Sequence, residues 1–227
     1  MTLREQMIQL GGADGFQFDA YHVDAGGTRK GGVVLVQEIF GVTTHIKEQC
    51  DRFAAQGYEV IAPSSYDRLE RGFQADYNET GIKHALKLRG GNNLDDNMGD
   101  VDACRAALAG KGQVFIAGYC FGGSITWIAC ARLKGFAAGS AYYGGMIPDH
   151  LDEVPTCPVI CHFGETDGSI PTEKVSLVQA VTNQHAGLET YVYPAGHGFQ
   201  SDRRKDYHAE SDALAWDRTM KLFEAQL

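Results

Sequence analysis

The sequence has no run of apolar residues long enough to cross a membrane and no excess of basic residues. A membrane-spanning helix needs about 20 consecutive apolar residues, and no such stretch occurs in this chain of 227 residues. Lysine and arginine number 20 against 29 aspartates and glutamates, which gives a formal net charge of −9. Surfaces that bind nucleic acid or anionic lipid need clustered Lys and Arg. We therefore expect neither nucleic acid nor a membrane as a partner.

Proline is scarce, with 6 residues, and the first ten residues, MTLREQMIQL, contain neither an apolar run nor a small-residue cleavage site. The sequence therefore predicts no signal peptide and a cytoplasmic protein. The 6 cysteines lie in a chain that is large enough to fold without cross-links, so we expect reduced thiols. The length and a hydrophobic content of 44% fit one domain over residues 1–227. We expect a monomer or a small homo-oligomer.

Strand patterns alternate with helix patterns along the chain. This alternation predicts an α/β protein with a mostly parallel central sheet and helices on both faces. Period-two residues over 16–23 indicate an early antiparallel strand. The other expected strands are 32–37, 58–62, 114–117, 136–143, 155–163 and 189–193, and the expected helices are 44–56, 76–89, 95–108, 172–186 and 206–225, with one more directly after residue 120.

One segment, VFIAGYCFGGS over residues 114–124, combines a buried strand, a sharp turn and a helix. Gly118 and Gly122 lie two residues before and two residues after Cys120. Glycines in these positions allow the strained turn that exposes a nucleophile between a strand and a helix. The segment therefore predicts that Cys120 is a nucleophile.

Four reactive side chains each follow a predicted strand: Glu38, Cys120, Asp167 and His197. In parallel sheets, ligands bind beyond the carboxyl ends of the strands, so we expect all four at one edge. A cysteine attacks as the thiolate and needs a base. His197 is the candidate base, and Asp167 is the candidate acceptor that orients its imidazole. The chain order of nucleophile, acid and histidine is that of the α/β-hydrolases.

Two backbone N–H groups are candidates for binding an oxyanion. The N–H of Phe121 lies at the start of the helix that follows Cys120, where the helix dipole favours negative charge. The N–H of Ile39 lies in the loop after the strand over residues 32–37. Together the two would hold the negative oxygen of a tetrahedral intermediate.

Four motifs, QEIFG, GYCFGG, FGETDGSIP and PAGHGF, occur in this order along the chain. With these motifs the whole chain resembles the dienelactone hydrolase family, which has the α/β-hydrolase fold. The resemblance implies hydrolysis of small esters or lactones, with dienelactone as the family's reference substrate (carboxymethylenebutenolidase activity). It implies a Cys120–His197–Asp167 triad, a covalent thioester and neither a cofactor nor a metal. By the same resemblance, Glu38 holds the resting thiol and takes its proton when substrate arrives.

The sequence departs from the family at two arginines that bind the substrate carboxylate. One of these positions is Ser201, four residues after the histidine, and the other falls near Ile82. Arg203 and Arg204 are close enough in sequence to His197 to substitute, while Lys83 and Arg89 could do so from the other side. Two aromatic residues, Tyr143 and Phe199, could line the substrate pocket or belong to the core.

Other interpretations stay open at this stage. Cys157, Cys161 and His162 could suggest a metal, but neighbouring strand residues point to opposite faces, which favours core packing. An exposed thiol at Cys120 could also serve redox chemistry through a sulfenic acid, although no cysteine close in sequence could resolve it. A non-catalytic sensor on the same fold is a third alternative.

Overall fold

The computed structural model describes residues 4–227, which contain eight strands, six α-helices and one short 3-10 helix. The contacts between residues divide the chain into two compact units, residues 1–115 and residues 116–227. The prediction of a single domain concerns both units together and stays a prediction. Each unit is described by itself below.

The first unit contains four paired strands with helices packed on them. The pairing order is β1, β2, β4, β3, with antiparallel pairing from β1 to β4 and parallel pairing between β4 and β3. The antiparallel strand expected over residues 16–23 is therefore confirmed. The bounds are Glu5–Gly11 for β1, Gln17–Val23 for β2, Gly31–Val36 for β3, Tyr58–Pro63 for β4, Thr44–Ala55 for α1, Glu79–Gly91 for α2 and Leu94–Leu108 for α3.

The pattern of apolar residues accounts for these elements. All residues of β3 and β4 are buried, as expected for parallel strands covered on both faces. Helix α1 buries one stripe, which includes Ile46, Cys50 and Phe53. Gly57 follows this helix with a φ of +93°, a backbone conformation that favours glycine.

Strand β1 was not expected from the sequence. It pairs with β2 along its whole length, for example Ile8 with Ala20. Only Ile8 and Leu10 are partly buried, and the other residues of β1 are exposed. An edge strand with so little apolar burial gives a weak periodic signal, which explains why it was missed.

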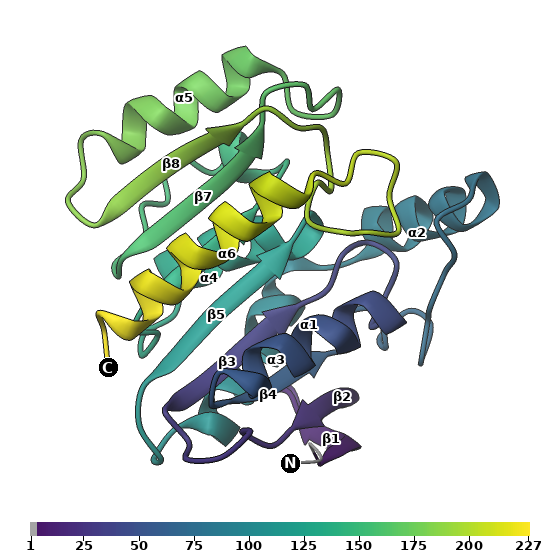
Figure 1. The fold of residues 1–227 in the computed structure, drawn as a ribbon. Coiled ribbons are helices and arrows are strands. Elements are labelled where there is room, and N and C mark those ends of the chain that lie inside the picture. Colours follow the sequence, from purple (N-terminus) through teal and green to yellow (C-terminus); the bar gives the residue numbers. More distant parts are fainter. Residues whose placement is uncertain (1–3) are drawn as a thin grey trace. The chain divides into compact units, whose positions relative to one another are not determined.

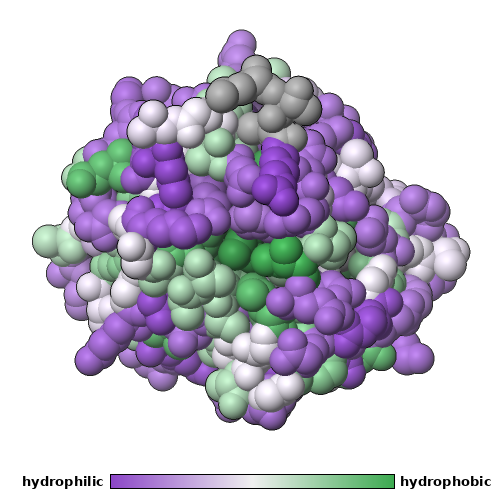
Figure 2. Space-filling model, turned by 90° about the horizontal axis from the view of Figure 1, so that it is seen from below, coloured by the Kyte–Doolittle hydropathy of each residue, from purple (hydrophilic) through white to green (hydrophobic). Residues whose placement is uncertain are grey.

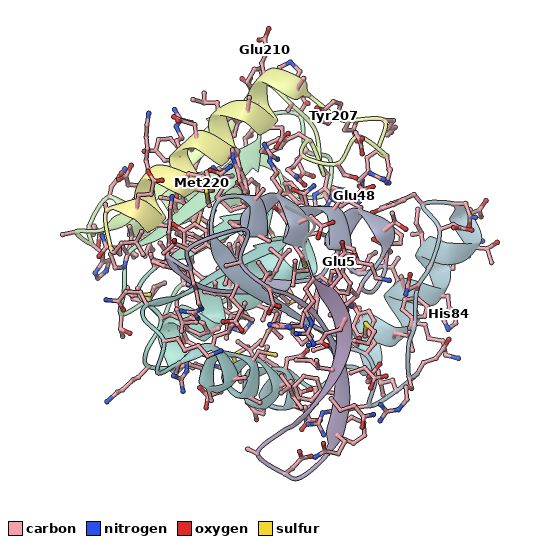
Figure 3. The ribbon with its side chains drawn as sticks, turned by 60° about the horizontal axis from the view of Figure 1, so that its bottom comes forward. Glu5, Glu48, His84, Tyr207, Glu210 and Met220 are labelled. Atoms are coloured by element: carbon pink, nitrogen blue, oxygen red, sulfur yellow. The ribbon has the colours of Figure 1, made fainter. Side chains whose placement is uncertain are left out.

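An acidic cluster lies where α1 packs near β1. Figure 3 labels two of its members, Glu5 on β1 and Glu48 on α1. Burial, together with the charges of these two glutamates, raises the pKa of Asp51. One oxygen of Asp51, Oδ1, is buried without a hydrogen-bond partner. At neutral pH the ionised carboxylate is therefore unfavourable in the folded chain.

Replacing Asp51 with asparagine is expected to raise the melting temperature at pH 7. A carboxyl whose folded pKa is raised binds its proton more tightly when folded, so its ionisation destabilises the fold as pH rises through that pKa. The difference from the wild type should shrink as the pH falls through the raised pKa of Asp51, where the folded chain gains the proton. Thermal melts across this range test the expectation, with Asp102→Asn as the control. If Asp51→Asn and the wild type had equal melting temperatures at pH 7, the expectation would be wrong.

The second unit contains β5 to β8, which pair in this order and run parallel to one another. Figure 1 shows α6 in front of these strands and α4 behind them. The strand β5, Val114–Tyr119, begins at the end of the first unit. The other bounds are Gly139–Tyr142 for β6, Val159–Gly164 for β7, Leu188–Tyr193 for β8, Phe121–Arg132 for α4, Ile147–Asp149 for the 3-10 helix η1, Thr172–Thr182 for α5 and Ala209–Glu224 for α6.

Strands β6 and β7 are shorter than the sequence predicted. The expected strand over 155–163 starts only at Val159, so Cys157 lies in the loop before it. Proline has no N–H to donate to a strand ladder, and Pro158 directly precedes β7. Cys157 therefore does not belong to the strand in which the sequence placed it together with Cys161 and His162.

A buried polar network joins α6 to the strands. The Thr219 hydroxyl on α6 lies 2.8 Å from both the Ser140 Oγ and the Tyr142 hydroxyl on β6. His162 on β7 lies 3.2 Å from the Ser140 Oγ through Nε2 and 2.7 Å from the Tyr193 hydroxyl through Nδ1. Burial lowers the pKa of His162 to about 3. The ring is therefore neutral and structural, as expected.

The outer surface carries many of the charged residues. On α6, Glu210 extends into solvent at the start of the helix, whereas Met220 is buried (Figure 3). The face drawn in Figure 2 is mostly hydrophilic, with apolar atoms gathered near its middle. None of the helices within residues 4–227 has the length and apolar character that crossing a membrane requires.

Candidate active site

The turn after β5 holds Cys120 in a strained backbone conformation. Its φ is 56° and its ψ is −111°, and a positive φ is uncommon for a residue other than glycine. The Cys120 N–H donates to the Tyr142 carbonyl at 2.9 Å, and the Cys120 carbonyl accepts from the Ser124 N–H at 3.2 Å. These bonds fix the turn between β5 and α4, and the Cys120 side chain stays partly exposed.

Glycines allow the backbone to close this turn. A Cβ on Gly118 would lie 2.2 Å from the Gly122 carbonyl oxygen, and a Cβ on Gly123 would lie 2.2 Å from the Tyr142 oxygen. Both distances are far shorter than a carbon–oxygen contact allows. The glycine pattern around Cys120 therefore reflects the close approach of β5, α4 and the end of β6.

The second unit brings Cys120, His197 and Asp167 into one hydrogen-bonded line. The Cys120 Sγ lies 3.2 Å from the His197 Nε2, and the His197 Nδ1 lies 2.6 Å from the Asp167 Oδ2. All three side chains follow strands, namely β5, β7 and β8. The histidine therefore contacts the sulfur with one ring nitrogen and the carboxylate with the other.

The Asp167 carboxylate is held by the backbone of its own loop. Its Oδ1 accepts the N–H of Ser169 at 2.8 Å and the N–H of Ile170 at 3.2 Å, which leaves Oδ2 for His197. The side chain is buried. Asp167 thus stabilises the turn of its own loop with one oxygen and contacts His197 with the other.

The loop that carries His197 packs closely on the loop after β7. A Cβ on Gly164 would lie 2.3 Å from the Ala195 carbonyl oxygen. The His197 ring packs edge-on against Tyr143, at 5.1 Å between centroids, and Tyr143 packs against Phe199 at 5.4 Å. Both aromatic residues are fully buried. They support the imidazole from the core side.

The electrostatics of the line favour a charged imidazole. Burial disfavours the imidazolium, but the charge of the adjacent Cys120 thiolate and the hydrogen bond to Asp167 outweigh burial and raise the pKa of His197 to about 10. A thiolate beside an imidazolium is the reactive form of a cysteine nucleophile. The arrangement can therefore support nucleophilic attack.

The pKa of His197 should fall when the sulfur is removed. In Cys120→Ala the thiolate charge is gone while Asp167 remains, so the imidazole loses part of the interaction that holds its proton. Proton NMR of the His197 ring across pH 5–11 measures this change, with Cys157→Ala as the control. An unchanged titration in Cys120→Ala would contradict the expectation.

The same shift makes the folded state sensitive to alkaline pH. The unfolded histidine titrates near pH 6.5, well below the folded pKa of about 10. Its contribution to stability is therefore complete below about pH 6.5 and is lost as the pH rises toward 10.

Comparisons with known proteins identify the family of the chain. The sequence profile described as "Dienelactone hydrolase family" matches residues 18–227. The chain belongs to the dienelactone hydrolase family. A relative from Synechocystis sp. named "Putative carboxymethylenebutenolidase" is 33% identical over 214 residues, or 86% of each chain. The "Carboxymethylenebutenolidase" of Pseudomonas putida is 29% identical over 197 residues, or 83% of each chain.

A solved structure supports the same conclusion. The crystal structure titled "Putative Dienelactone Hydrolase" from Klebsiella pneumoniae superposes with a TM-score of 0.86 at 30% identity and covers 99% of both chains. A dienelactone hydrolase-like promiscuous phosphotriesterase from metagenomic libraries, 17% identical, has a TM-score of 0.82 and shares the fold. The expected α/β-hydrolase fold is confirmed.

Two residues expected at the site of this family member, Glu38 and Ile39, belong to the first unit. Glu38 follows β3, is fully buried and accepts a hydrogen bond from the Tyr77 hydroxyl at 2.7 Å. Tyr77 was not singled out from the sequence, which placed it in the helix expected over residues 76–89, whereas the observed helix α2 begins at Glu79. The roles of Glu38 and Ile39 beside Cys120 stay predictions. In the second unit, Phe121 occupies the first position of α4, as expected for an oxyanion donor.

The two candidate arginines differ in their surroundings. Arg203 is exposed and pairs with its neighbour Asp202 at 2.6 Å. Arg204 packs on the histidine loop, since a Cβ on Gly198 would lie 2.5 Å from the Arg204 Cδ. Of the two, Arg204 has the contact with the loop of His197.

One group of residues in the described part of the chain has ligand atoms close enough to share a metal ion: His22, Asp24 and Glu59. The Arg29 guanidinium already lies 2.6 Å from the Glu59 Oε2, and the His22 Nε2 lies 3.0 Å from Oε1. Burial opposes ionisation of Glu59, but the hydrogen bonds to His22 and Arg29 lower its pKa. These contacts are those of an ion-pair network.

Proposed function

We propose that this member of the dienelactone hydrolase family hydrolyses small esters or lactones with Cys120 as the nucleophile. The observation that carries the proposal is the continuous line of contacts from the Cys120 Sγ through His197 to Asp167, at 3.2 Å and 2.6 Å. A thiolate, a base and an orienting carboxylate in this geometry are the parts that acyl transfer requires.

In the first half of the reaction, the Cys120 thiolate attacks the carbonyl carbon and forms a tetrahedral oxyanion. The N–H groups of Phe121 and Ile39 would donate to this oxygen. When the C–O bond breaks, His197 gives its proton to the leaving oxygen. The products of this half are a thioester on Cys120 and the released alcohol, or the opened chain of a lactone.

In the second half, His197 takes a proton from water, and the resulting hydroxide attacks the thioester carbonyl. Collapse of the second tetrahedral intermediate releases the carboxylic acid and restores the thiolate beside the protonated imidazole. Before substrate enters, Glu38 would hold Cys120 as a neutral thiol. Glu38 would take the thiol proton when substrate arrives, which forms the attacking thiolate, and would return it to the sulfur after the acid leaves. Its burial and its hydrogen bond from Tyr77 suit a carboxylate that is kept out of bulk water.

An acyl-trapping experiment tests the proposal. The protein is mixed with an activated aryl ester, quenched in acid and digested, and the peptides are analysed by mass spectrometry. We expect the acyl group on the Cys120 peptide together with steady turnover of the ester. Cys157 is the matched control, because it and Cys120 are the partly exposed cysteines. Cys157→Ser should form the adduct normally. Peroxide consumption without ester turnover, or no acyl adduct, would overturn the proposal.

A second experiment identifies the substrate class. KM and kcat are measured for dienelactone, simple lactones and aryl esters, each with and without a carboxylate. If Arg204 binds a substrate carboxylate, the charged members should have the lower KM, and Arg204→Gln should remove that preference. Arg203→Gln is the matched control. A preference for neutral esters would rule out a carboxylate clamp from this loop.

A further inference from the structure

The strand β8 ends the order of paired strands, and within residues 4–227 no strand pairs with its outer edge (Figure 1). The N–H of Val159 on β7 donates to the Gly187 carbonyl, directly before β8, at 3.0 Å. Because the backbone groups of alternate residues point to opposite edges of a strand, the N–H and C=O groups of Thr190 and Val192 point to the outer edge. The strand contains neither lysine nor proline, which often keep edge strands from pairing.

Three large apolar side chains are exposed around this edge, namely Val192 on β8 (41%), Leu177 on α5 (55%) and Leu214 on α6 (44%). The Thr190 hydroxyl lies 3.0 Å from the Thr182 hydroxyl on α5, so Val192, two residues further along β8, points to the same side of the sheet. Leu177 lies five residues before Thr182, which is about 7.5 Å along a helix. Two strand residues span about 6.6 Å, so Leu177 and Val192 lie at a similar height along the edge.

The other side of β8 carries one charge of each sign. Glu189 accepts a hydrogen bond from the Tyr191 hydroxyl. The Arg218 guanidinium on α6 lies over the Tyr191 ring, at 3.8 Å from its centroid, and donates to the Tyr193 hydroxyl at 2.9 Å. Leu214 lies four residues before Arg218 and therefore on the same face of α6. The edge thus combines outward backbone groups, exposed apolar side chains and two opposite charges.

We propose that this edge binds the same edge of a second copy of the chain, with β8 antiparallel to β8 about a two-fold axis at Tyr191. Thr190 then lies opposite Val192 of the second copy, and their outward N–H and C=O groups form hydrogen bonds in both directions. Strands β5 to β8 of the two copies form one continuous sheet. A two-fold axis makes the contact self-complementary and closes the assembly at two chains.

The charges favour a second copy as the partner. In the same pairing Glu189 lies opposite Tyr193 of the second copy, and directly opposite residues of antiparallel strands share one face of the sheet. Because the Arg218 guanidinium is hydrogen bonded to that tyrosine, Glu189 of each copy faces Arg218 of the other. The two-fold axis produces this contact between opposite charges twice. The pairing also covers the exposed Val192 of both copies.

The first test is the mass of the particle in solution, which does not depend on the hydrolase function. Sedimentation velocity across the micromolar range should show a dimer whose fraction rises with concentration. Val192→Lys should lose the dimer, because a lysine in the middle of an edge strand opposes pairing. Met7→Lys is the matched control, since Met7 is an exposed apolar residue (54%) of β1, the strand at the other end of the pairing order. This variant should keep the dimer.

A charge exchange tests the register. Glu189→Lys alone and Arg218→Glu alone each place like charges opposite each other twice, so each variant by itself should be monomeric. In an equimolar mixture of the two variants, the new lysine faces the new glutamate, and the native Arg218 of one copy faces the native Glu189 of the other. The mixture should therefore form a heterodimer. Thermal melts of the separate variants check that each is folded.

Three results would overturn the proposal. The first is a wild type that stays monomeric at every concentration. The second is a dimer that Met7→Lys dissociates and Val192→Lys does not, which would place the contact on β1. The third is a mixture of the two folded charge variants that contains only monomers although the wild type dimerises. If Arg218→Glu does not fold, the comparison of Val192→Lys with Met7→Lys still decides.

Discussion

Replacing Cys120 with alanine is expected to reduce ester hydrolysis by about 10⁴-fold or more in kcat, since removal of the nucleophile from a triad eliminates the covalent route. The fold should persist. Alanine keeps the Cβ that the backbone at φ 56° already accommodates, and the Cys120 side chain is partly exposed. Initial rates with an aryl ester and thermal melts measure both quantities.

The matched control is Cys157→Ala, which removes the other partly exposed sulfur. It should keep the wild-type rate, because Cys157 contacts neither His197 nor Asp167 in the line of contacts described above. Turnover in Cys120→Ala that approaches the wild-type rate would refute a cysteine nucleophile. Equal losses in both variants would point to damage to the fold.

Replacing Gly118 with alanine is expected to destabilise the chain by about 3 kcal/mol or more, because an added methyl in a closed site forces the backbone to move. The new Cβ would lie 2.2 Å from the Gly122 oxygen and 2.3 Å from the Gly122 carbonyl carbon. These are backbone atoms at the start of α4, which cannot rotate aside. Displacement of this helix would also move Cys120, so kcat should fall as well.

Gly168→Ala is the control for this experiment. A Cβ on Gly168 would have no atom within 4 Å. Like Gly118, Gly168 lies close in sequence to a proposed triad residue, in this case Asp167. Urea unfolding followed by circular dichroism gives the free energy of unfolding for each variant. Similar free energies of unfolding for the Gly118 and Gly168 variants would show that the close approach of Gly118 to Gly122 does not limit stability.

The sequence predicted the parts of this chain in which local pattern and burial agree. Helix α1 has a clear apolar stripe and strands β3 and β4 are continuous buried runs, and none of their expected bounds differs from the observed one by more than one residue. The turn at Cys120 was predictable because its glycines mark a backbone conformation that few other residues adopt. Strand β1 was not, because it lies at an edge and buries few apolar side chains.

Within the site, the sequence predicted the line from Cys120 through His197 to Asp167, but not the backbone N–H groups that hold Asp167. Cys120, Asp167 and His197 were predictable because each follows a strand of a parallel sheet. The start of β7 was not, because Pro158 keeps Cys157 out of the strand in which the sequence placed it.

The hydrogen bonds of Asp167 make its two oxygens unequal. In a free aspartate the two oxygens exchange by rotation, but here two backbone N–H groups hold Oδ1 and only Oδ2 faces His197. The carboxylate has no donor of its own, so the proton between Oδ2 and the ring belongs to Nδ1. When the imidazole is neutral, this leaves the lone pair on Nε2, on the side of the sulfur. The loop backbone thereby selects the tautomer of a histidine that follows a different strand.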